Sequence, residues 1–567
     1  MNFVAINALR MMAVEGCLLG AAFLACFLCL KFLHRSPWRP QWLRWILDRN
    51  SRSVLFVITV ALLARALLLP AVGVPEPHIN DEYGYLLMAD TFSHHRLTNP
   101  TPLAWPHFET FHVNMTPTYH SKYPVAQGLV LAFGEMFFHQ PWAGVYLSTA
   151  LMCGAICWAL QAFFPPVWAL LGGLLAVVRM ALFSYWMNSY WGGSVAALGG
   201  AVALGAVVRL FQHGRTSRSR VMLACLFGLA LLVLATSRPY EGFAFSIPLL
   251  AYFAYRAVRS AAKREANLRT TALPVVLIGL VGITLMGYYN KTTTGSPFLL
   301  PYVLYQRTYP DLPFALPLLV NHKPRPELPA RDPVFAKWYA VLAEEHGYAQ
   351  TKTLPGMMGL EAGRLGIDWF FYVGPALTIP VLTGFVSCIR QPRLRIAVAI
   401  TLTTGAAIAI CLVSQPHYFS PATVAVYLFA VEGLYYLWQE PGTGARAFVL
   451  AVCLTTVIAA LTRQTGSAGM YQTFSFPDTR KTIAADLERK PGKHLVLVSY
   501  DMDRHYPGDE LVHNGADFRS AKVLWARSKG AGKDADLCRA YPDRIFWSLT
   551  TDDVNVSFQP LDLCPQP

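Results

Sequence analysis

The chain has 567 residues, of which 54% are hydrophobic and only 14% are charged, and its mean hydropathy is positive. Soluble globular proteins carry about 25% charged residues, and the apolar residues here come in runs of about 18 or more, long enough to cross a bilayer. This composition excludes a soluble globular protein and predicts a polytopic membrane protein.

The net charge of +14 is concentrated in five short segments between apolar runs. These segments hold 17 Lys and Arg against three Asp and Glu, a surplus equal to the whole net charge. They are residues 34–52, 212–220, 255–271, 390–395 and 439–446. Short basic loops mark the cytoplasmic side of a membrane protein. The charge therefore predicts topology, and nucleic acid is not an expected partner.

The apolar runs begin with residues 12–33, which a basic stretch follows, so we expect the N-terminus outside the cytoplasm. Residues 53–74 then cross outward. Further runs follow at 141–163, 165–187, 193–211, 221–236, 243–257, 272–289, 371–389, 396–413, 419–438 and 446–463. Alternating these runs predicts about twelve transmembrane helices and puts all five basic segments in the cytoplasm. The apolar piece at 124–138 is short and is expected to be an interfacial or re-entrant helix.

Two long loops, 76–140 and 290–370, are expected on the outer face. The second is rich in Pro and aromatic residues and contains a helix-like stretch at 332–346. Loops of this length are usually functional or disordered. The aromatic content of the second loop favours an ordered cap on the membrane surface. We predict a mainly α, polytopic helical bundle at 1–463 and a soluble domain at 464–567.

The C-terminal region differs in composition from the bundle. It has strand-like runs at 494–500 and 544–549 and a helix-like stretch at 519–527, which together predict a small α/β domain on the outer face. Cys538 and Cys564 are the only two cysteines in this polar region. Outside the cytoplasm, a disulfide between them is expected.

The stretch Asn80-Asp81-Glu82-Tyr83-Gly84-Tyr85 opens the first outer loop. Asp81 is a candidate general base, with Glu82 assisting, because transfer of a group to a hydroxyl needs a carboxylate that takes the proton. Tyr85 is a candidate for lining the substrate. The alternative is a solvated carboxylate pair, or Asp81 capping a short helix.

Lys122 and Tyr123 stand just before the expected interfacial helix, about forty residues after Asp81. Lys122 is a candidate for neutralising a lipid phosphate. The alternative is a lysine that extends to the headgroup level of the membrane. His120 beside it is a candidate acid, metal ligand or neither.

Arg238, Tyr240 and Glu241 lie in a turn between two apolar runs on the expected outer face. An arginine there departs from the positive-inside trend, so it requires a partner, either Glu241 or an anionic ligand such as phosphate. Arg179 lies inside an apolar run, where a charge usually faces a cavity.

His417 and Tyr418 lie in another outer turn and could hydrogen-bond a phosphate or a sugar. The chain contains no GxxxxGK[ST], no GxGxxG after a strand, no HExxH and no CxxC metal pattern. Nucleotide hydrolysis and zinc hydrolase chemistry therefore have no support. A divalent cation stays open, because a carboxylate pair beside a phosphate could hold one.

Taken together, these motifs resemble those of GT-C glycosyltransferases, the membrane enzymes that use polyprenyl-phosphate sugars. The strongest likeness is to the branch of protein O-mannosyltransferases and lipid A aminoarabinose transferases, over roughly residues 53–440. The motifs that carry it are Asp81-Glu82-x-x-Tyr85 and Lys122-Tyr123-Pro124. The Arg238-Pro239 and His417-Tyr418 turns and the alternating apolar runs are compatible with it.

This resemblance implies that Asp81 is the catalytic carboxylate and that Lys122 contacts the donor phosphate. Two features depart from the branch. Ser121-Lys122-Tyr123 stands where it often has Lys-Pro-Pro or Glu-Lys-Pro, which leaves the role of Tyr123 open. The C-terminal region, including the stretch at 513–517, does not match the aminoarabinose transferases, so their acceptor is not carried over.

The sequence thus predicts a glycosyltransferase of a bacterial inner membrane with its active site and C-terminal domain in the periplasm. The expected partners are a polyprenyl-phosphate sugar donor, membrane lipids, and a glycan, lipid or protein acceptor. Asp81 would deprotonate the acceptor hydroxyl, and Lys122, Tyr123, Arg238, His417 and Tyr418 would hold the donor phosphate. The alternatives are a transporter or flippase of a lipid-linked saccharide, and a scaffold whose tail binds a partner.

Overall fold

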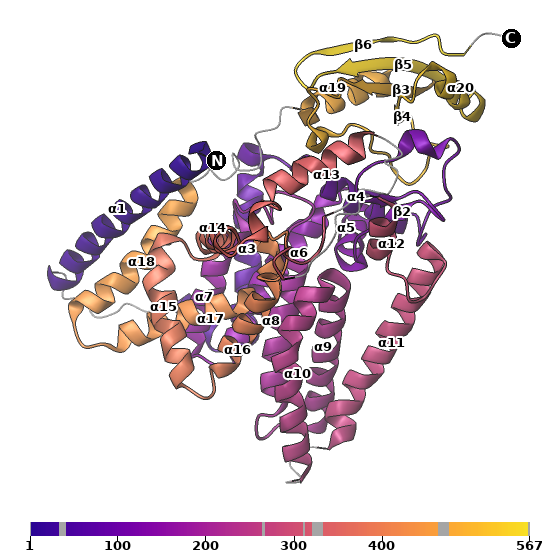
Figure 1. The fold of residues 1–567 in the computed structure, drawn as a ribbon. Coiled ribbons are helices and arrows are strands. Elements are labelled where there is room, and N and C mark those ends of the chain that lie inside the picture. The colour runs from indigo at the N-terminus through magenta and orange to yellow at the C-terminus, as the bar shows by residue number, and fades with distance from the viewer. Residues whose placement is uncertain are drawn as a thin grey trace.

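The computed structural model describes residues 2–32, 41–262, 267–309, 312–319, 333–462 and 476–564. Its larger part is a bundle of helices, and a small sheet domain lies over one end of that bundle (Figure 1). We call the end that carries the sheet domain the outer end. The bundle helices are α1 (Asn2–Phe32), α2 (Gln41–Leu47), α3 (Asn50–Val72), α4 (Asn80–Ser93), α5 (Val125–Phe138), α6 (Trp142–Leu160), α7 (Pro166–Ala176), α8 (Ser194–Leu210), α9 (Ser217–Ser237), α10 (Pro239–Ala262), α11 (Leu268–Thr294), α12 (Pro301–Thr308), α13 (Pro333–Glu345), α14 (Leu354–Tyr372), α15 (Gly374–Arg390), α16 (Arg395–Ile408), α17 (Thr423–Gln439) and α18 (Thr443–Thr462).

Each apolar run predicted to cross the membrane contains a helix. Within the described ranges, six helices are long and apolar enough to cross a bilayer, and a seventh span results if the bent pair α14–α15 counts as one. The remaining crossings predicted from sequence are shorter or less apolar helices, such as α7, α8 and α16. Most of α8 is buried inside the bundle. A helix that contacts protein on all sides does not have to match the bilayer thickness, so the twelve apolar runs give fewer full-length spans.

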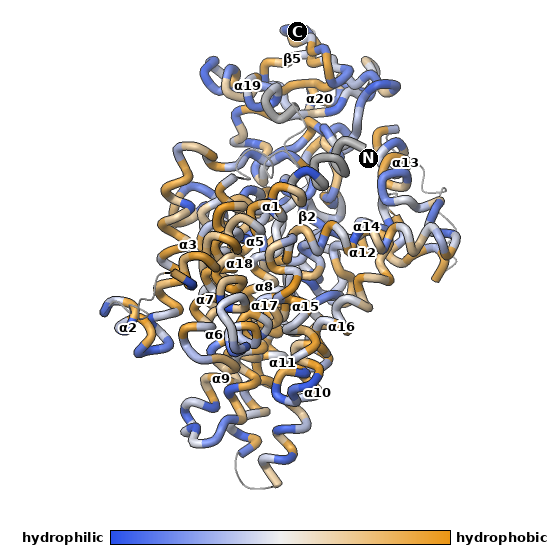
Figure 2. Tube along the Cα trace, turned by 90° about the vertical axis from the view of Figure 1, so that its left-hand side faces the viewer, coloured by the Kyte–Doolittle hydropathy of each residue, from blue (hydrophilic) through white to orange (hydrophobic). Residues whose placement is uncertain are grey.

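Hydropathy follows the same division along the molecule (Figure 2). Hydrophobic residues dominate the middle of the bundle, and hydrophilic residues gather over the sheet domain and at the opposite tips of α9, α10 and α11. An apolar belt between two polar ends is what a bilayer requires of a spanning bundle. The structure is therefore that of a multi-pass membrane protein.

The expected outer loop at 290–370 is largely helical. It contains α12, α13 and most of α14, of which only α13 was predicted, as the stretch at 332–346. The chain bends by 99° between α14 and α15. Gly374 stands at this bend with φ +66°, a left-handed conformation that glycine adopts without steric cost. The bend starts α15 in a new direction.

The C-terminal domain is an α/β unit, as predicted. Its sheet has the strand order β4-β3-β5-β6, with β3 parallel to β4 and β5, and β6 antiparallel to β5. Its elements are α19 (Phe476–Arg489), β3 (Lys493–Tyr500), β4 (Val523–Arg527), α20 (Ala531–Ala540), β5 (Arg544–Thr551) and β6 (Val556–Pro560). The runs at 494–500 and 544–549 are strands as expected. The helix expected at 519–527 is wrong, because Val523, Leu524 and Trp525 instead extend along β3, where Leu524 and Trp525 bury their apolar side chains.

The C-terminal domain shares its hydrophobic core with the first outer loop. Leu495 and Leu497 of β3 belong to the same buried cluster as Phe108 and Tyr119 of the loop and Leu87 of α4. Burial of this apolar surface stabilises the contact by about 25 cal/mol for each Å² removed from water. The domain therefore rests on α4 and the loop as part of one core.

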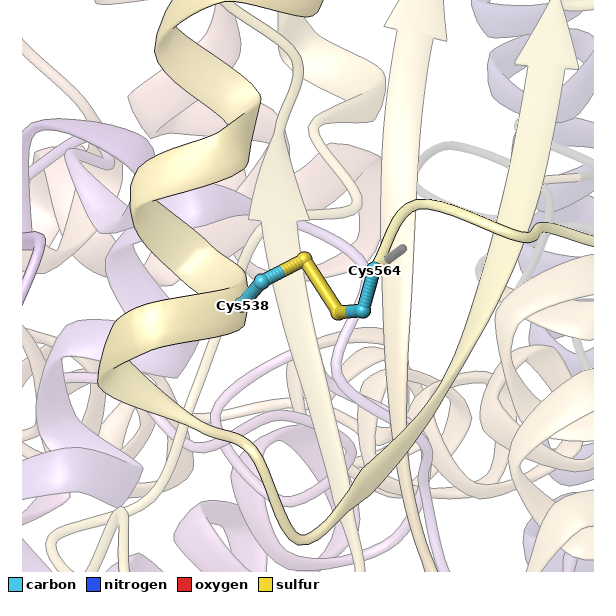
Figure 3. The surroundings of a disulfide bond; sticks show 2 residues. All are labelled: Cys538 and Cys564. Atoms are coloured by element: carbon cyan, nitrogen blue, oxygen red, sulfur yellow. A yellow bond between two sulfur atoms is a disulfide. The ribbon is translucent and has the colours of Figure 1, made fainter. Parts of the chain in front are cut away.

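Cys538 of α20 and Cys564, which follows β6, are joined in a disulfide, with their Cα atoms 5.6 Å apart (Figure 3). The bond ties the last described residues of the chain to α20. The other nine cysteines are free.

Removing this disulfide is expected to destabilise the C-terminal domain. A crosslink between residues 26 positions apart restricts the unfolded chain, which is worth about 3 kcal/mol in the chain-entropy account. Limited proteolysis within residues 476–564 at increasing urea reports unfolding of this domain. We expect Cys538→Ser with Cys564→Ser to unfold at lower urea than the wild type, and Cys225→Ser, a free cysteine of α9, is the control. Equal midpoints for the double variant and the wild type would contradict this role.

Candidate functional site

Helix α4 begins with two carboxylates that have different partners. Glu82 is buried, and its Oε2 accepts hydrogen bonds from the backbone N–H groups of His78 (2.7 Å) and Ile79 (3.2 Å). Its Oε1 accepts from the N–H of Tyr190 (2.8 Å). Burial raises the pKa of Glu82 to about 7, although these backbone bonds act in the opposite direction. Glu82 thus holds the start of α4 and ties it to the segment before α8.

Asp81 faces a different group of side chains. Its Oδ1 accepts a hydrogen bond of 2.5 Å from the Tyr123 hydroxyl, and its Oδ2 lies 3.4 Å from His112 Nε2. The Asp81 side chain is 30% exposed, so it can meet a ligand. Burial alone would raise the pKa of Asp81, but His112, the Tyr123 hydrogen bond and the charge of Lys122 hold it well below its usual range. Asp81 is therefore an ionised carboxylate of fixed orientation.

Lys122 lies among aromatic rings. Its Nζ is 4.5 Å from the ring centre of Tyr305, 5.0 Å from Tyr302 and 5.6 Å from Tyr123. The side chain is buried, and the ring faces attract its charge. The backbone N–H of Lys122 donates to the carbonyl of His112 (3.0 Å). The structure thus places the ammonium in an aromatic cage beside Asp81.

Tyr85 connects this group to Arg238. The ring of Tyr85 stacks on Tyr123 with 4.4 Å between centres, and the charge of Arg238 acts on its hydroxyl. The Arg238 guanidinium lies 4.7 Å from the ring centre of Tyr418 and interacts electrostatically with the buried Glu241. The turn after α9 and the turn before α17 therefore meet the start of α4.

His417 lies beside Tyr418, in the short helix Pro416–Ala422. Its Nδ1 is 2.9 Å from the hydroxyl of Tyr185, and its ring centre is 4.5 Å from that of Trp191. His417 is buried and interacts electrostatically with both Arg238 and Asp81. The structure thus brings eight residues predicted from sequence into one group at the outer end: Asp81, Tyr85, Lys122, Tyr123, Arg238, Glu241, His417 and Tyr418.

Besides Glu82, the predicted site residues Tyr240 and His120 have structural partners away from this group. Tyr240 donates to the carbonyl of Ala407 (3.0 Å) and packs against Phe314. His120 is buried in the β1–β2 hairpin (Val113–Asn114, His120–Ser121), where its ring nitrogens contact Thr118 and Asn114. Burial lowers the pKa of His120 to about 4, so it is neutral at ordinary pH.

Arg179 lies at the bend between α14 and α15. Its guanidinium donates to the carbonyls of Phe370 and Phe371, both at 2.8 Å, where α14 ends. Glu15 lies at the same bend and accepts from the N–H of Ala376. The charge inside the apolar run thus satisfies backbone groups that the bend leaves open.

Replacing Arg179 with Met is expected to lower thermal stability without removing the binding of ligands at Asp81. Hydrogen bonds from a charged group contribute about 1.5–3 kcal/mol each, and both carbonyls would lose their donor. Unfolding in detergent measures the loss. The control is Arg390→Met, at the exposed end of α15, which is expected to have little effect. A stable Arg179→Met protein that no longer binds polyprenyl phosphate would instead place Arg179 in the binding site.

The other face of α4 borders a cavity of about 350 Å³. Tyr83, Leu87 and Asp90 line it from α4, and Arg480 and His513 line it from the C-terminal domain. Residues 83, 87 and 90 lie opposite Asp81 and Tyr85 on the helix surface. One face of α4 thus contributes to the charged group, and the other contacts the C-terminal domain.

Sequence reasoning missed several residues that contact the site. His112 has no motif around it, and its contact with Asp81 depends on a left-handed backbone conformation (φ +65°). Tyr302 and Tyr305 belong to the aromatic-rich loop, which was recognised as ordered but not as part of the site. The regular spacing of aromatic residues at 302–309 was the sequence feature that could have indicated these two tyrosines.

Among the residues that the structure describes, no group of three or more His, Cys, Asp or Glu is arranged to hold a metal ion. Asp81 and Glu82 do not converge, because the oxygens of Glu82 face backbone amides. A cation at Asp81 would therefore need ligands from the substrate.

No protein-family model matches this sequence, and no curated protein matches it. Solved structures with a similar arrangement include ArnT from Cupriavidus metallidurans bound to undecaprenyl phosphate, with a TM-score of 0.49, 12% identity and coverage of 88% of this chain and 93% of that one. The apo oligosaccharyltransferase of Archaeoglobus fulgidus has a TM-score of 0.47 at 12% identity, over 83% of this chain, which spans about 65% of that protein. The mycobacterial arabinofuranosyltransferase AftD has a TM-score of 0.38 at 12% identity, over 89% of this chain and 35% of that one. All three are GT-C glycosyltransferases, the superfamily that the sequence motifs resemble.

Proposed function

We propose that this protein transfers a sugar from a polyprenyl-phosphate donor to an acceptor hydroxyl at the outer end of the bundle. The observation that carries the proposal is the ionised Asp81 beside the caged Lys122, with Arg238 in the same group, at the outer end of the bundle. A carboxylate and two cations suit a reaction in which an oxygen loses a proton while a phosphate gains charge.

The cations would act on the leaving group. As the bond between the sugar and the phosphate breaks, its electron pair stays on the phosphate, which gains negative charge. Lys122 and Arg238 would bind that charge more strongly in the transition state than in the ground state. Because Lys122 is buried and Arg238 is half-buried, their attraction to phosphate is screened less than that of exposed charges.

Asp81 would take the proton of the acceptor hydroxyl. The acceptor oxygen bonds to the anomeric carbon as the phosphate leaves from the opposite side, so the reaction inverts that carbon. A carboxylate of low pKa is a weak base, so the proton moves late, once bond formation has made the hydroxyl acidic. Tyr123 and His112 hold the two Asp81 oxygens for this step.

Helix α5 supports access from the membrane. It begins directly after Tyr123 and Pro124, and its far end exposes Phe133, Met136, Phe137 and Phe138. An exposed apolar face of this kind contacts lipid in a membrane protein. A prenyl chain could lie along α5 with its phosphate at Lys122.

In the proposed membrane topology, the outer end of the bundle lies in the periplasm, and the helices cross a bacterial inner membrane. The basic segments Arg215–Arg220 and Arg390–Arg395 join helices away from the C-terminal domain, as the positive-inside rule requires of a cytoplasmic face. The disulfide of the C-terminal domain fits an oxidising compartment. Glycan, lipid and protein acceptors all stay open.

The test uses purified protein in detergent or nanodiscs. Mass spectrometry of co-purifying lipids is expected to find a polyprenyl phosphate, with or without a sugar. A panel of undecaprenyl-phosphate sugars then tests turnover, measured as free undecaprenyl phosphate and released or transferred sugar. Movement of the intact lipid between the leaflets without cleavage would favour the transporter. Bulk phospholipid alone, with no cleavage of any donor, would contradict the proposal.

A further inference from the structure

The C-terminal domain reaches α4 through the segment 513–516. His513 is buried and stacks on Tyr83, with ring centres 3.9 Å apart and planes within 4°. The N–H of Ala516 donates to Asp90 (2.6 Å), and the carbonyl of Asn514 accepts from the Tyr119 hydroxyl (2.9 Å). The segment therefore touches both α4 and the first outer loop.

Both ring nitrogens of His513 lie within hydrogen-bond distance of a polar side chain. Nε2 lies 3.2 Å from Asn80 Oδ1, and Nδ1 lies 3.2 Å from the Thr110 hydroxyl. The amide nitrogen of Asn80 faces the carbonyl of Pro507, which leaves its oxygen toward His513. Because that oxygen can only accept, Nε2 donates to it, and Nδ1 lies within hydrogen-bond distance of the Thr110 hydroxyl. A neutral imidazole thus joins two segments of the chain.

These two segments supply the groups that surround the candidate base. Asn80 directly precedes Asp81, and Thr110 stands two residues before His112. The carbonyl of His112 in turn accepts from the N–H of Lys122. One side chain of the C-terminal domain therefore fixes the spacing between the Asp81 segment and the His112 segment.

We propose that His513 is a positioning residue that holds Asp81 and His112 in register, so that the C-terminal domain completes the active site. This inference rests on the proposed function for its effect on turnover, and on the geometry alone for its effect on the two segments. His513 reaches the reaction only through Asn80 and Thr110.

The effect of pH depends on the charged and titratable groups around His513 and Asp81. Burial and the charges of Arg480, His112 and Arg527 lower the pKa of His513 and favour its neutral form, and a hydrogen bond to the backbone of Glu510 acts in the opposite direction. The groups that face Asp81 are Glu82, Tyr85, His112, Lys122, Tyr123, His346, His417 and Tyr418. Of these, His112 is the one whose distance from Asp81 depends on the His513 bridge.

His505 supplies a matched control within the same domain. It is also buried, stacks on Tyr500 with ring centres 3.8 Å apart, and contacts Asp553 at 2.7 Å. No hydrogen bond or ring contact found for His505 involves α4 or the first outer loop among the described residues. His505→Ala should therefore remove a ring of the same size as His513→Ala while keeping the His513 contacts with Asn80 and Thr110.

Hydrogen–deuterium exchange tests the positioning without any substrate. We expect His513→Ala to exchange faster than the wild type at residues 78–84 and 108–114, and His505→Ala to match the wild type there. Thr110→Val removes only the hydrogen bond between His513 and the first outer loop, so it should speed exchange at residues 108–114. This variant decides the question if His513→Ala does not fold. Equal exchange in these segments for the His513 variant and the His505 control would overturn the inference.

Turnover tests the consequence. With a donor that the wild type cleaves, His513→Ala is expected to lower kcat roughly 10- to 100-fold, the scale of a displacement of about 1 Å at a reacting group. The acidic limb of its pH profile should move to higher pH, because Asp81 loses the nearby His112. His513→Gln, which keeps a donor and an acceptor, should recover part of both.

The outcomes separate the two proposals. A wild-type protein that cleaves no donor contradicts the proposed function, and the exchange comparison still decides the positioning role. Turnover in the wild type with normal kcat and an unshifted pH limb in His513→Ala overturns the positioning role alone. A uniform loss of activity with no shift of the limb also overturns it, because a loss of folded protein has that signature.

Discussion

Asp81→Asn is expected to lower kcat for sugar transfer by roughly 10²- to 10⁴-fold, the contribution typical of a general base. The amide keeps the size of the side chain and can still contact Tyr123, but it cannot take a proton. Turnover of an undecaprenyl-phosphate sugar measures the loss. Binding of undecaprenyl phosphate by the same variant should be retained, because Lys122 and Arg238 are unchanged.

Glu76→Gln is the matched control for this substitution. Glu76 lies five residues before Asp81 on the same loop, is exposed and pairs with Lys481 at the surface. Neutralising such a pair costs little, so activity and stability should stay close to the wild type. Transfer by Asp81→Asn at the rate of the Glu76→Gln control would remove Asp81 from the reaction.

The pH profile gives a second test of Asp81. Its pKa in the folded protein lies below its ordinary value of about 4, so the folded state favours the ionised form. The contribution of this ionised group to stability is thus present above pH 4 and is lost as the pH falls through the lower folded pKa. Activity should persist to pH 4, and His112→Asn should move the acidic limb upward. An unmoved limb would mean that His112 does not act on Asp81.

Lys122→Met is expected to weaken the binding of undecaprenyl phosphate by roughly 10- to 100-fold. Hydrogen bonds to charged groups are worth about 1.5–3 kcal/mol, and this ammonium is held beside Asp81 by three tyrosine rings. Met fills similar space among the rings without the charge. Thermal stabilisation by undecaprenyl phosphate, titrated in detergent, measures the affinity.

Lys291→Met is the control for binding. Lys291 is exposed in the last turn of α11, near the same surface, so it tests whether any lysine there attracts the lipid. We expect Arg238→Lys to weaken binding less than Arg238→Met, since Lys keeps the charge but loses the planar guanidinium. Equal affinity for Lys122→Met and the wild type would move the phosphate site away from Lys122.

Parts of this site could be predicted because they lie close together in the sequence. Asp81 opens the first outer loop and Lys122 closes it, and both flank apolar segments, so their approach required only that the loop fold over the membrane surface. The tyrosines that surround Lys122 could not be predicted in this way. Tyr302 and Tyr305 come from a loop about 180 residues later, and no local pattern couples them to a lysine. Glu82 was predicted to assist catalysis because of its charge. Only the fold showed that backbone N–H groups donate to both of its carboxylate oxygens.

The sequence by itself determined the membrane class and the helical content, and it predicted a division between bundle and tail and a cytoplasmic side for the basic loops. These properties follow from hydropathy and charge, which each segment carries whatever its neighbours are. Only the tertiary structure decided that Val523–Arg527 is a strand, that α14 bends away from α15, and that His513 meets Asn80 across 433 positions of sequence. Such contacts depend on which surfaces pack together, and packing is a property of the whole chain that no single segment contains.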